Sequence, residues 1–199
     1  MFFNLVQIKM ISKKFNIAIF ASGNGTNAEA IIKYFLGHES IAITLLLSNS
    51  PDARALQRAE NLDIPTSIFT NDQFVSGVEI KKWLVESKIT HIVLAGFLRL
   101  IPDYLLKSYP IINIHPSLLP KFGGKGMYGR KVHEAVQQAG EIETGITIHE
   151  VNDRFDEGRV LFQVTTVLDA GDNADSISEK VHALEYKYYP GIIEKWILA

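Results

Sequence analysis

The chain has 199 residues, of which 47% are hydrophobic and 21% charged, and its formal net charge is −2. This length and composition are typical of one globular domain, and the near-neutral charge argues against a nucleic-acid backbone as the main partner. The sequence contains no cysteine, which excludes disulfides, thiolate catalysis and zinc–thiolate sites. No apolar run approaches the roughly 18 residues of a membrane span. We therefore expect a cytoplasmic protein with neither nucleic acid nor a membrane as partner.

A single domain is expected over residues 15–199, after a short N-terminal extension over residues 1–14. The extension, MFFNLVQIKMISKK, is hydrophobic but is interrupted by Asn4, Gln7 and Lys9. It lacks the basic start and the unbroken apolar centre of a signal peptide. We assign it no function.

Segments typical of strands alternate with segments typical of helices as far as residue 115. The sequence predicts strands at 16–21, 41–48, 66–70, 90–96 and 111–115, and helices at 28–37, 51–63, 77–88 and 102–109. Beyond them it predicts a helix at 128–140, two strands at 144–151 and 159–167 that form an antiparallel pair, and a long helix at 174–197. Apolar strands separated by helices indicate a parallel sheet covered by helices. The predicted fold class is therefore α/β: a doubly wound, mostly parallel open sheet with helices on both faces and a mixed or antiparallel C-terminal part.

Ligands of such sheets bind outside the carboxyl ends of the strands. Three polar clusters, at 22–27, 96–101 and 113–117, follow predicted strands. Their coincidence at one edge of the sheet predicts a binding site there.

The turn SGNGTN at 22–27 joins the first predicted strand to the first predicted helix. Gly23 and Gly25 allow the backbone to approach a ligand, and the amides at a helix start favour an anion such as phosphate. The pattern also matches G-x-G-x-x-A, but Ser48 and Asn49 stand where a dinucleotide site needs an acid. A phosphate monoester therefore fits better than a dinucleotide. A tight turn that only caps the helix is the simpler alternative, because such patterns are weakly specific.

Asn113 and His115 alternate with isoleucines in INIHPSLLP, so they lie on one face of a strand that ends at Pro116. The later loop VNDRFDEGRVL carries Asp153, Asp156 and Glu157, and one of these carboxylates can reach His115. A nearby carboxylate is expected to raise the pKa of the histidine. A protonated His beside an Asn amide supplies two donors for an oxyanion in acyl transfer. A satisfied polar pair without function is the alternative.

Other chemistries have weaker support. The G-x-S-x-G motif of serine hydrolases is absent. His115, His149 and Asp156 could form a set of two histidines and one carboxylate, but no HxH or HExxH spacing exists, so we predict no metal. A structural role for His149 is as well supported as a functional one. The histidines at 38, 91, 133 and 182 are interpreted as surface or core residues.

Five motifs together resemble one family: NIAIFASGNGTN, VLAGFLRLI, NIHPSLLP, TGITIHEVNDRFDEGRVLFQ and EYKYYPGII. They are similar, in the same order and over residues 15–197, to the phosphoribosylglycinamide formyltransferases, folate-dependent enzymes of purine biosynthesis. The resemblance implies a doubly wound α/β fold. It also implies transfer of formyl from the co-substrate 10-formyltetrahydrofolate to the amine of glycinamide ribonucleotide, with these two small molecules as partners of a monomer or homodimer.

The resemblance further implies roles for individual residues. His115 matches the general acid and oxyanion donor, Asn113 orients the formyl group, and Asp156 raises the pKa of the histidine and organises a relay water. The residues that match the ribonucleotide site are Gly23, Asn24, Gly25, Thr26, Asn27 and Glu185. Those that match the folate site are Leu98, Arg99, Leu100, Ile101, Asn113, Val151, Asn152 and Asp153.

The chain departs from the family pattern in two places. No Lys or Arg lies between residues 59 and 80, where some relatives place an Arg toward the folate tail. The loop KFGGKGMYG at 121–129, with four glycines, differs from the commoner form, so its contacts do not carry over.

Three alternatives are disfavoured. A formyltransferase for initiator tRNA carries an extra C-terminal domain and a basic surface, and formyltetrahydrofolate hydrolase has an added regulatory domain. A non-catalytic nucleotide-binding module would keep the 22–27 turn but has no need of Asn113, His115 and Asp156 together.

Overall fold

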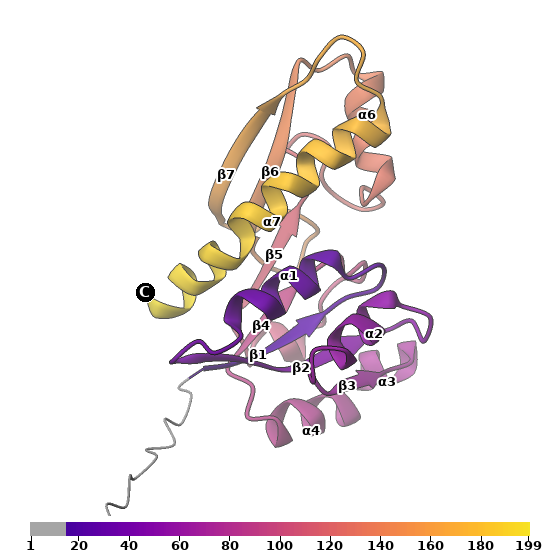
Figure 1. The fold of residues 1–199 in the computed structure, drawn as a ribbon. Helices are drawn as coiled ribbons and strands as arrows, with labels where there is room; N and C mark the ends of the chain where they lie inside the picture. Colours follow the sequence, from indigo (N-terminus) through magenta and orange to yellow (C-terminus); the bar gives the residue numbers. More distant parts are fainter. Residues whose placement is uncertain (1–14) are drawn as a thin grey trace, which may run out of the picture.

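The computed structural model describes residues 15–199, and the predicted extension at 1–14 lies outside the described residues. The strands are β1 (Phe15–Phe20), β2 (Ile41–Ser48), β3 (Thr66–Ile68), β4 (His91–Leu94), β5 (Ile111–His115), β6 (Glu143–Glu150) and β7 (Val160–Val167). The helices are α1 (Thr26–Phe35), α2 (Arg54–Glu60), α3 (Asn71–Ser76), α4 (Val78–Glu86), α5 (Asp103–Leu106), α6 (Arg130–Gln138) and α7 (Ala174–Leu198) (Figure 1).

The described strands form one seven-stranded sheet in the order β3-β2-β1-β4-β5-β6-β7. Strands β1 to β5 pair in parallel, whereas β5–β6 and β6–β7 pair antiparallel. The predicted fold class is confirmed, including the antiparallel C-terminal part. Helix α3 was not predicted; it is short, and it begins at a capping box between Thr70 and Gln73.

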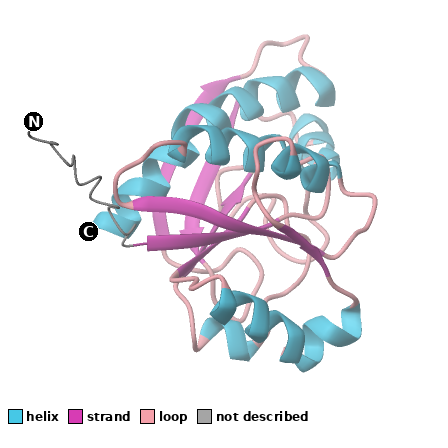
Figure 2. Cartoon of the chain, turned by 60° about the horizontal axis from the view of Figure 1, so that its bottom comes forward, coloured by secondary structure: helices cyan, strands magenta, loops and turns pink. Residues whose placement is uncertain are grey.

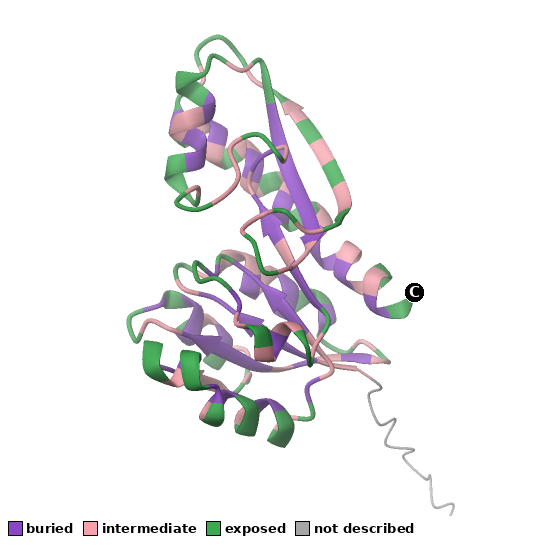
Figure 3. Cartoon of the chain, turned by 180° about the vertical axis from the view of Figure 1, so that it is seen from behind, coloured by how far each residue is buried: buried purple, intermediate pink, exposed green. Residues whose placement is uncertain are grey.

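Helices cover both faces of the sheet, as the side view shows (Figure 2). One buried cluster joins the sheet to α1, α2, α6 and α7, and a second joins the opposite face to α3, α4 and α5. The central strands are almost entirely buried, whereas the edge strand β7 alternates between partly buried and exposed residues (Figure 3). None of the helices within residues 15–199 is long and apolar enough to span a membrane.

A crevice opens in the sheet next to β5 because β4 is short. Their parallel pairing ends where Leu94 lies opposite Asn113. Beyond Asn113 the edge of β5 that faces β4 has no strand beside it, so the last residues of β5 border open space. This is the kind of position at which doubly wound sheets bind ligands.

Helix α7 is fastened to the same two strands by a buried tyrosine. The side chain of Tyr189 is fully buried, and its hydroxyl donates a hydrogen bond to the carbonyl oxygen of Leu94 at 2.9 Å. The carbonyl of Ile112 lies 3.4 Å from the same hydroxyl. The helix is therefore held at the ends of β4 and β5, close to the crevice.

Candidate active site

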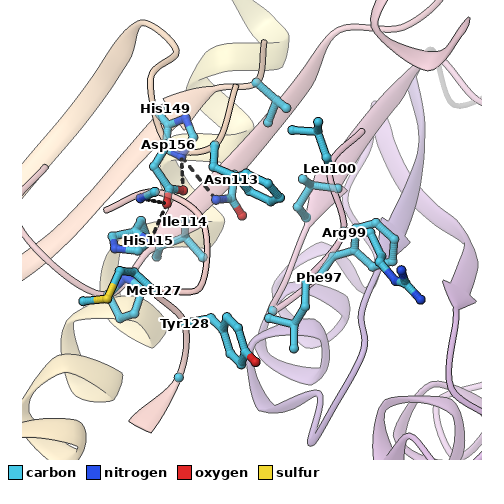
Figure 4. Close-up of a pocket in the computed structure, with 18 of the residues that line it drawn as sticks. Phe97, Arg99, Leu100, Asn113, Ile114, His115, Met127, Tyr128, His149 and Asp156 are labelled. Carbon is cyan, nitrogen blue, oxygen red and sulfur yellow. Dashed lines mark hydrogen bonds and ion pairs between the residues drawn. The ribbon is translucent and has the colours of Figure 1, made fainter. Parts of the chain in front are cut away.

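A cavity of about 790 Å³ occupies the crevice at the ends of β4 and β5. Its walls come from the segment after β4, the end of β5, the loop after Gly124, the loop after β6, and helices α6 and α7. In Figure 4, Asn113, His115, His149 and Asp156 lie on one side, and Phe97, Arg99 and Leu100 lie on the other.

The three residues matched to the catalytic trio meet at this cavity. Asn113 and His115 both line it, as expected for alternate residues of one strand. The carboxylate of Asp156 lies between two imidazoles: its Oδ2 is 3.5 Å from Nδ1 of His115, and its Oδ1 is 3.6 Å from Nε2 of His149. Of the loop's three acidic residues, Asp156 is the one that reaches His115.

His149 orients the amide of Asn113. The amide nitrogen of Asn113 donates to Nε2 of His149 at 3.2 Å, and Nδ1 of His149 donates to the carbonyl oxygen of Glu150 at 2.8 Å. Both ring nitrogens of His149 are thereby used, which fixes the direction in which Asn113 presents its second N–H. Because His149 lies opposite Asn113 in the β5–β6 ladder, the antiparallel pairing creates this contact.

The pKa of His115 beside Asp156 differs from the expected direction. Burial lowers the pKa of His115, and this outweighs the raising effects of the Asp156 charge and the Phe122 carbonyl. The prediction of a raised pKa for His115 is therefore wrong in direction, because His115 is only 3% exposed, which the sequence does not reveal. Burial alone would raise the pKa of Asp156, but His149, His115 and the amide of Gly124 together hold that pKa below its usual value.

No group of three or more His, Cys, Asp or Glu side chains within residues 15–199 is arranged to hold a metal ion. His115, His149 and Asp156 do come together, but the carboxylate contacts the two rings directly.

The residues matched to the folate site mostly line the cavity: Leu98, Arg99, Leu100, Ile101, Asn113, Val151 and Asn152. Asp153 does not line it. Leu98 and Leu100 are about half exposed, and Phe97 and Ile101 are buried beneath them, so this wall presents apolar surface to the cavity. Arg99 is hydrogen-bonded to Asn71. Such a wall suits one face of a flat ring.

The 22–27 turn lies next to the cavity but does not line it. Gly25 has φ +74, and a Cβ there would meet the Cα of Ala55 at 2.4 Å, so this glycine is required for packing against α2. Asn27 donates to Glu185 at 2.8 Å, and Glu185 does line the cavity. Burial raises the pKa of Glu185 to about 7, opposed by the hydrogen bond from Asn27. These two side chains link the turn to the cavity.

Sequence reasoning missed two histidines of the cavity wall. His133 on α6 and His182 on α7 both line it, and their rings lie 6.3 Å apart. His133 is buried, and its pKa is lowered to about 4 by burial and by the neighbouring charges of His182, His115 and Arg130. The interpretation of both as ordinary surface or core residues is therefore incomplete. Only the docking of α6 and α7 shows which face points to the cavity.

Comparisons with known proteins agree with this fold. The formyl transferase family model matches residues 15–193. The phosphoribosylglycinamide formyltransferase of Bacillus subtilis is 37% identical over 190 residues, covering 92% of this chain and 94% of the relative. The solved structure of phosphoribosylglycinamide formyltransferase from Bacillus halodurans superposes with a TM-score of 0.82 at 34% identity, covering 92% and 95% of the two chains. The structure of that enzyme from Anaplasma phagocytophilum has the same TM-score at 31% identity, covering 91% and 86%.

This fold and these matches define a class of enzymes that transfer a formyl group. The chain belongs to the formyl transferase family. Within that family, the named relatives are phosphoribosylglycinamide formyltransferases. The resemblance inferred from the five sequence motifs is thereby confirmed.

Proposed function

We propose that this chain transfers the formyl group of 10-formyltetrahydrofolate to the amine of glycinamide ribonucleotide, a step of purine biosynthesis. The observation that carries the proposal is the meeting of Asn113, His115 and Asp156 at one wall of the cavity. Relatives that cover nearly the whole chain bear the corresponding name. The reaction uses acid–base groups and hydrogen-bond donors, and we assign no metal to it.

In the proposed reaction the substrate amine attacks the formyl carbon. A new N–C bond forms, the bond from that carbon to N10 of the folate breaks, and one amine proton passes to N10. The negative charge that develops on the formyl oxygen needs donors that are already in place. Asn113 offers its second amide N–H, and His115 offers Nε2–H, which now donates to the carbonyl of Phe122 at 2.8 Å.

Asp156 prepares His115 for this task. It faces Nδ1, so it directs the opposite nitrogen, Nε2, away from itself and toward an acceptor. The formyl oxygen takes the place of the Phe122 carbonyl as that acceptor. Its developing negative charge raises the pKa of His115 again, which favours proton transfer through the imidazole. The low pKa of the free enzyme's histidine is thus compatible with its role as acid.

The two substrates occupy different walls of the cavity. We place the pterin of the folate against the apolar residues 97–101, with Val151 and Asn152 at its edge. Asp153 does not line the cavity, so its place in the folate site stays a prediction. The ribonucleotide phosphate is placed at the free amides of Gly23 to Asn27 at the start of α1, where the helix dipole favours an anion. Glu185, bonded to Asn27, then lies between the phosphate and the reacting amine.

Several broader expectations remain predictions. They are a single domain over residues 15–199, a monomer or homodimer, and a cytoplasmic location.

The test is formyl transfer followed by absorbance of the folate product, with glycinamide ribonucleotide present and absent. Wild type is compared with His115→Ala and Asp156→Asn, after thermal melts show that both variants fold. We expect turnover only with the ribonucleotide, reduced roughly 10²–10⁴-fold in both variants, the range for loss of acid–base catalysis. Turnover without the ribonucleotide would indicate a hydrolase. Binding of the ribonucleotide without any turnover would indicate a non-catalytic module.

A further inference from the structure

The two segments that we assign to the two substrates meet at one serine. Ser22 opens the 22–27 turn, and its hydroxyl donates a hydrogen bond to Oδ1 of Asn49 at 2.7 Å. The same hydroxyl oxygen accepts a hydrogen bond from the backbone N–H of Leu98 at 3.2 Å. The backbone N–H of Ser22 donates to the carbonyl oxygen of Gly96 at 3.1 Å. A single residue therefore joins the segments that follow β1, β2 and β4.

The place of Ser22 in the sheet explains how it reaches both neighbours. Strand β1 lies between β2 and β4, and it pairs in parallel with each of them. The three segments thus leave the sheet at the same edge, with Ser22 in the middle. Asn49 occupies the position where a dinucleotide site needs an acid, and its side chain is instead a partner of Ser22.

The segment 96–101 forms one wall of the cavity, whereas Ser22 does not line the cavity. In Figure 4, Phe97 and Arg99 of this 96–101 wall lie across the cavity from Asn113. Ser22 binds the backbone on both sides of Phe97, at the Gly96 carbonyl and at the Leu98 amide. These two hydrogen bonds fix the start of the wall relative to the turn.

The rest of the turn is attached to α2. The carbonyl oxygen of Gly23 accepts from the amide of Ala55 at 3.1 Å, and that of Asn24 accepts from Nε of Arg58 at 2.9 Å. The turn is therefore held by α2 on one side and, through Ser22, by the 96–101 wall on the other. A change in the backbone of the turn is passed to the wall by the bonds of Ser22.

We propose that Ser22 is a positioning residue that couples the two substrate sites: its hydroxyl transmits ordering of the phosphate-binding turn to the wall that receives the pterin. The inference rests on the proposed function, which places the ribonucleotide phosphate at this turn and the pterin at this wall. Ser22 acts through its neighbours, Gly23 in the turn and Leu98 in the wall.

The expected sign of the coupling is positive. A phosphate bound to the amides of the turn restricts the motion of that backbone. The hydrogen bonds of Ser22 extend this restriction to Gly96 and Leu98. The folate then binds to a wall that is already ordered, so its binding costs less conformational entropy. Because such coupling is reciprocal, each ligand should bind more tightly when the other is present.

The test compares Ser22→Ala, which loses the hydroxyl and both of its bonds, with Ser22→Thr, which keeps a hydroxyl. The matched control is Thr90→Ala. The hydroxyl of Thr90 also joins β1 to the segment of β4 by two bonds, with the N–H of Asn16 at 3.1 Å and its carbonyl oxygen at 3.0 Å. These bonds lie at the opposite ends of the strands, so a general loosening of the β1–β4 pair would appear equally in both alanine variants.

The first readout is the affinity for glycinamide ribonucleotide, measured by calorimetry with and without saturating tetrahydrofolate. This pair of ligands cannot react, because neither carries a formyl group. In the wild type the folate should tighten ribonucleotide binding by roughly 5- to 150-fold, the usual range of coupling between sites. Ser22→Ala should reduce this factor by roughly 2- to 10-fold, the effect of a lost hydrogen bond. Ser22→Thr and Thr90→Ala should keep the wild-type factor.

The outcomes separate this inference from the proposed function. A wild type that binds both ligands without coupling overturns the inference alone. It is also overturned if Ser22→Ala keeps the full coupling, or if Thr90→Ala loses as much. A wild type that does not bind the ribonucleotide overturns the proposed function, and the inference with it. If Ser22→Ala does not fold, Asn49→Ala replaces it, because it removes the oxygen that orients the serine hydroxyl.

The second readout is hydrogen exchange of the Leu98 amide, followed by NMR. Binding of glycinamide ribonucleotide alone should slow this exchange in the wild type and in Thr90→Ala, but not in Ser22→Ala. The amide of Val151, which donates to the carbonyl of Ile111 at 2.9 Å, is the internal reference, and its exchange should not respond. Equal slowing at Leu98 and Val151 would mean that the ligand orders the whole cavity, and it would overturn the role of Ser22.

Discussion

Two glycine-rich segments border the cavity, and glycine serves a different purpose in each. In the 22–27 turn, Gly25 is needed because α2 packs against it, and a Cβ would meet backbone atoms of Ala55. In the 121–129 loop, Gly124, Gly126 and Gly129 have open space around them and positive φ angles, whereas a Cβ at Gly123 would meet the side chain of Leu119 at 2.4 Å. Packing constrains Gly25 in the first segment, whereas backbone conformation constrains three of the four glycines in the second.

This difference separates what a glycine motif can and cannot indicate. A glycine between a strand and a helix occurs in a recurrent geometry, so its pattern predicts a turn with free amides. Glycines in a long loop indicate only that the backbone takes uncommon angles. What the loop touches, here His115 and Asp156, depends on the rest of the fold.

The largest expected effect is that of Gly25→Ala. The added Cβ lies 2.4 Å from Ala55 Cα, a backbone atom, and the residue keeps positive φ, so α1 and α2 must separate. We expect a loss of about 2 to 4 kcal/mol in the free energy of unfolding, measured by urea denaturation. Gly23→Ala is the control, because nothing lies within 4 Å of its Cβ. Equal stability of the two variants would remove the contrast between the segments.

The link between the turn and the cavity is tested by Glu185→Gln. The folded-state pKa of Glu185 is raised to about 7, so its neutral form favours folding below its usual pKa of 4.5, and this contribution is lost as pH rises through 7. The glutamine side chain of this variant stays neutral and still accepts the hydrogen bond from Asn27. The variant should be more stable than wild type by about 2 to 3 kcal/mol at pH 8.5 and by little at pH 4.5. Parallel stability curves would show that Glu185 does not ionise in the fold.

The attachment of the 121–129 loop is tested at Thr147, whose hydroxyl anchors the residues just before that loop. Its hydroxyl donates to the carbonyl of Ser117 at 2.7 Å and accepts from the amide of Leu119 at 3.0 Å. Thr147→Val removes the partner of these two groups and of the side-chain amide of Gln163, which donates to the same hydroxyl at 2.8 Å, so we expect a loss of about 2 kcal/mol in urea unfolding. Thr147→Ser keeps the hydroxyl and should lose clearly less. If Thr147→Ser is destabilised as much as Thr147→Val, the loss of stability comes from the packing of the methyl group and not from the hydrogen bonds.

The smallest expected effect is that of alanine substitutions in the 121–129 loop. Gly124→Ala and Gly126→Ala meet no neighbouring atoms, so each should cost only the strain of positive φ, about 1 kcal/mol in the free energy of unfolding. Gly171→Ala, with open space and ordinary φ, should cost less than either. A loss from Gly124→Ala as large as that from Gly25→Ala would mean that the loop, too, is fixed by packing.

The fold was largely predictable because its strands are apolar on both faces. Strand β2, predicted at 41–48, has these bounds in the structure. Helix α3 was missed because its six residues are too few for a helical pattern of apolar positions. Its only signal is local, the pair of Thr70 and Gln73 that forms a capping box.

The candidate site was predictable only in its side chains. Asn113 and His115 were found from strand alternation, and the loop of Asp156 from its carboxylates. The backbone contacts of Phe122 and Gly124 leave no trace in residue types, because any residue has a carbonyl. The direction of the pKa shift of His115 depends on how deeply the ring is buried. Local sequence does not determine that depth.

The buried hydroxyl of Tyr189 also gives the protein an internal optical probe. Burial raises the pKa of this phenol well above its ordinary value, while it stays bonded to the carbonyl of Leu94. In an alkaline absorbance titration, Tyr189 is therefore expected to form its phenolate only at high pH. Tyr189 can do so only when α7 detaches from the ends of β4 and β5. A separate rise of phenolate absorbance at high pH would therefore report the opening of the structure around the cavity without any added label.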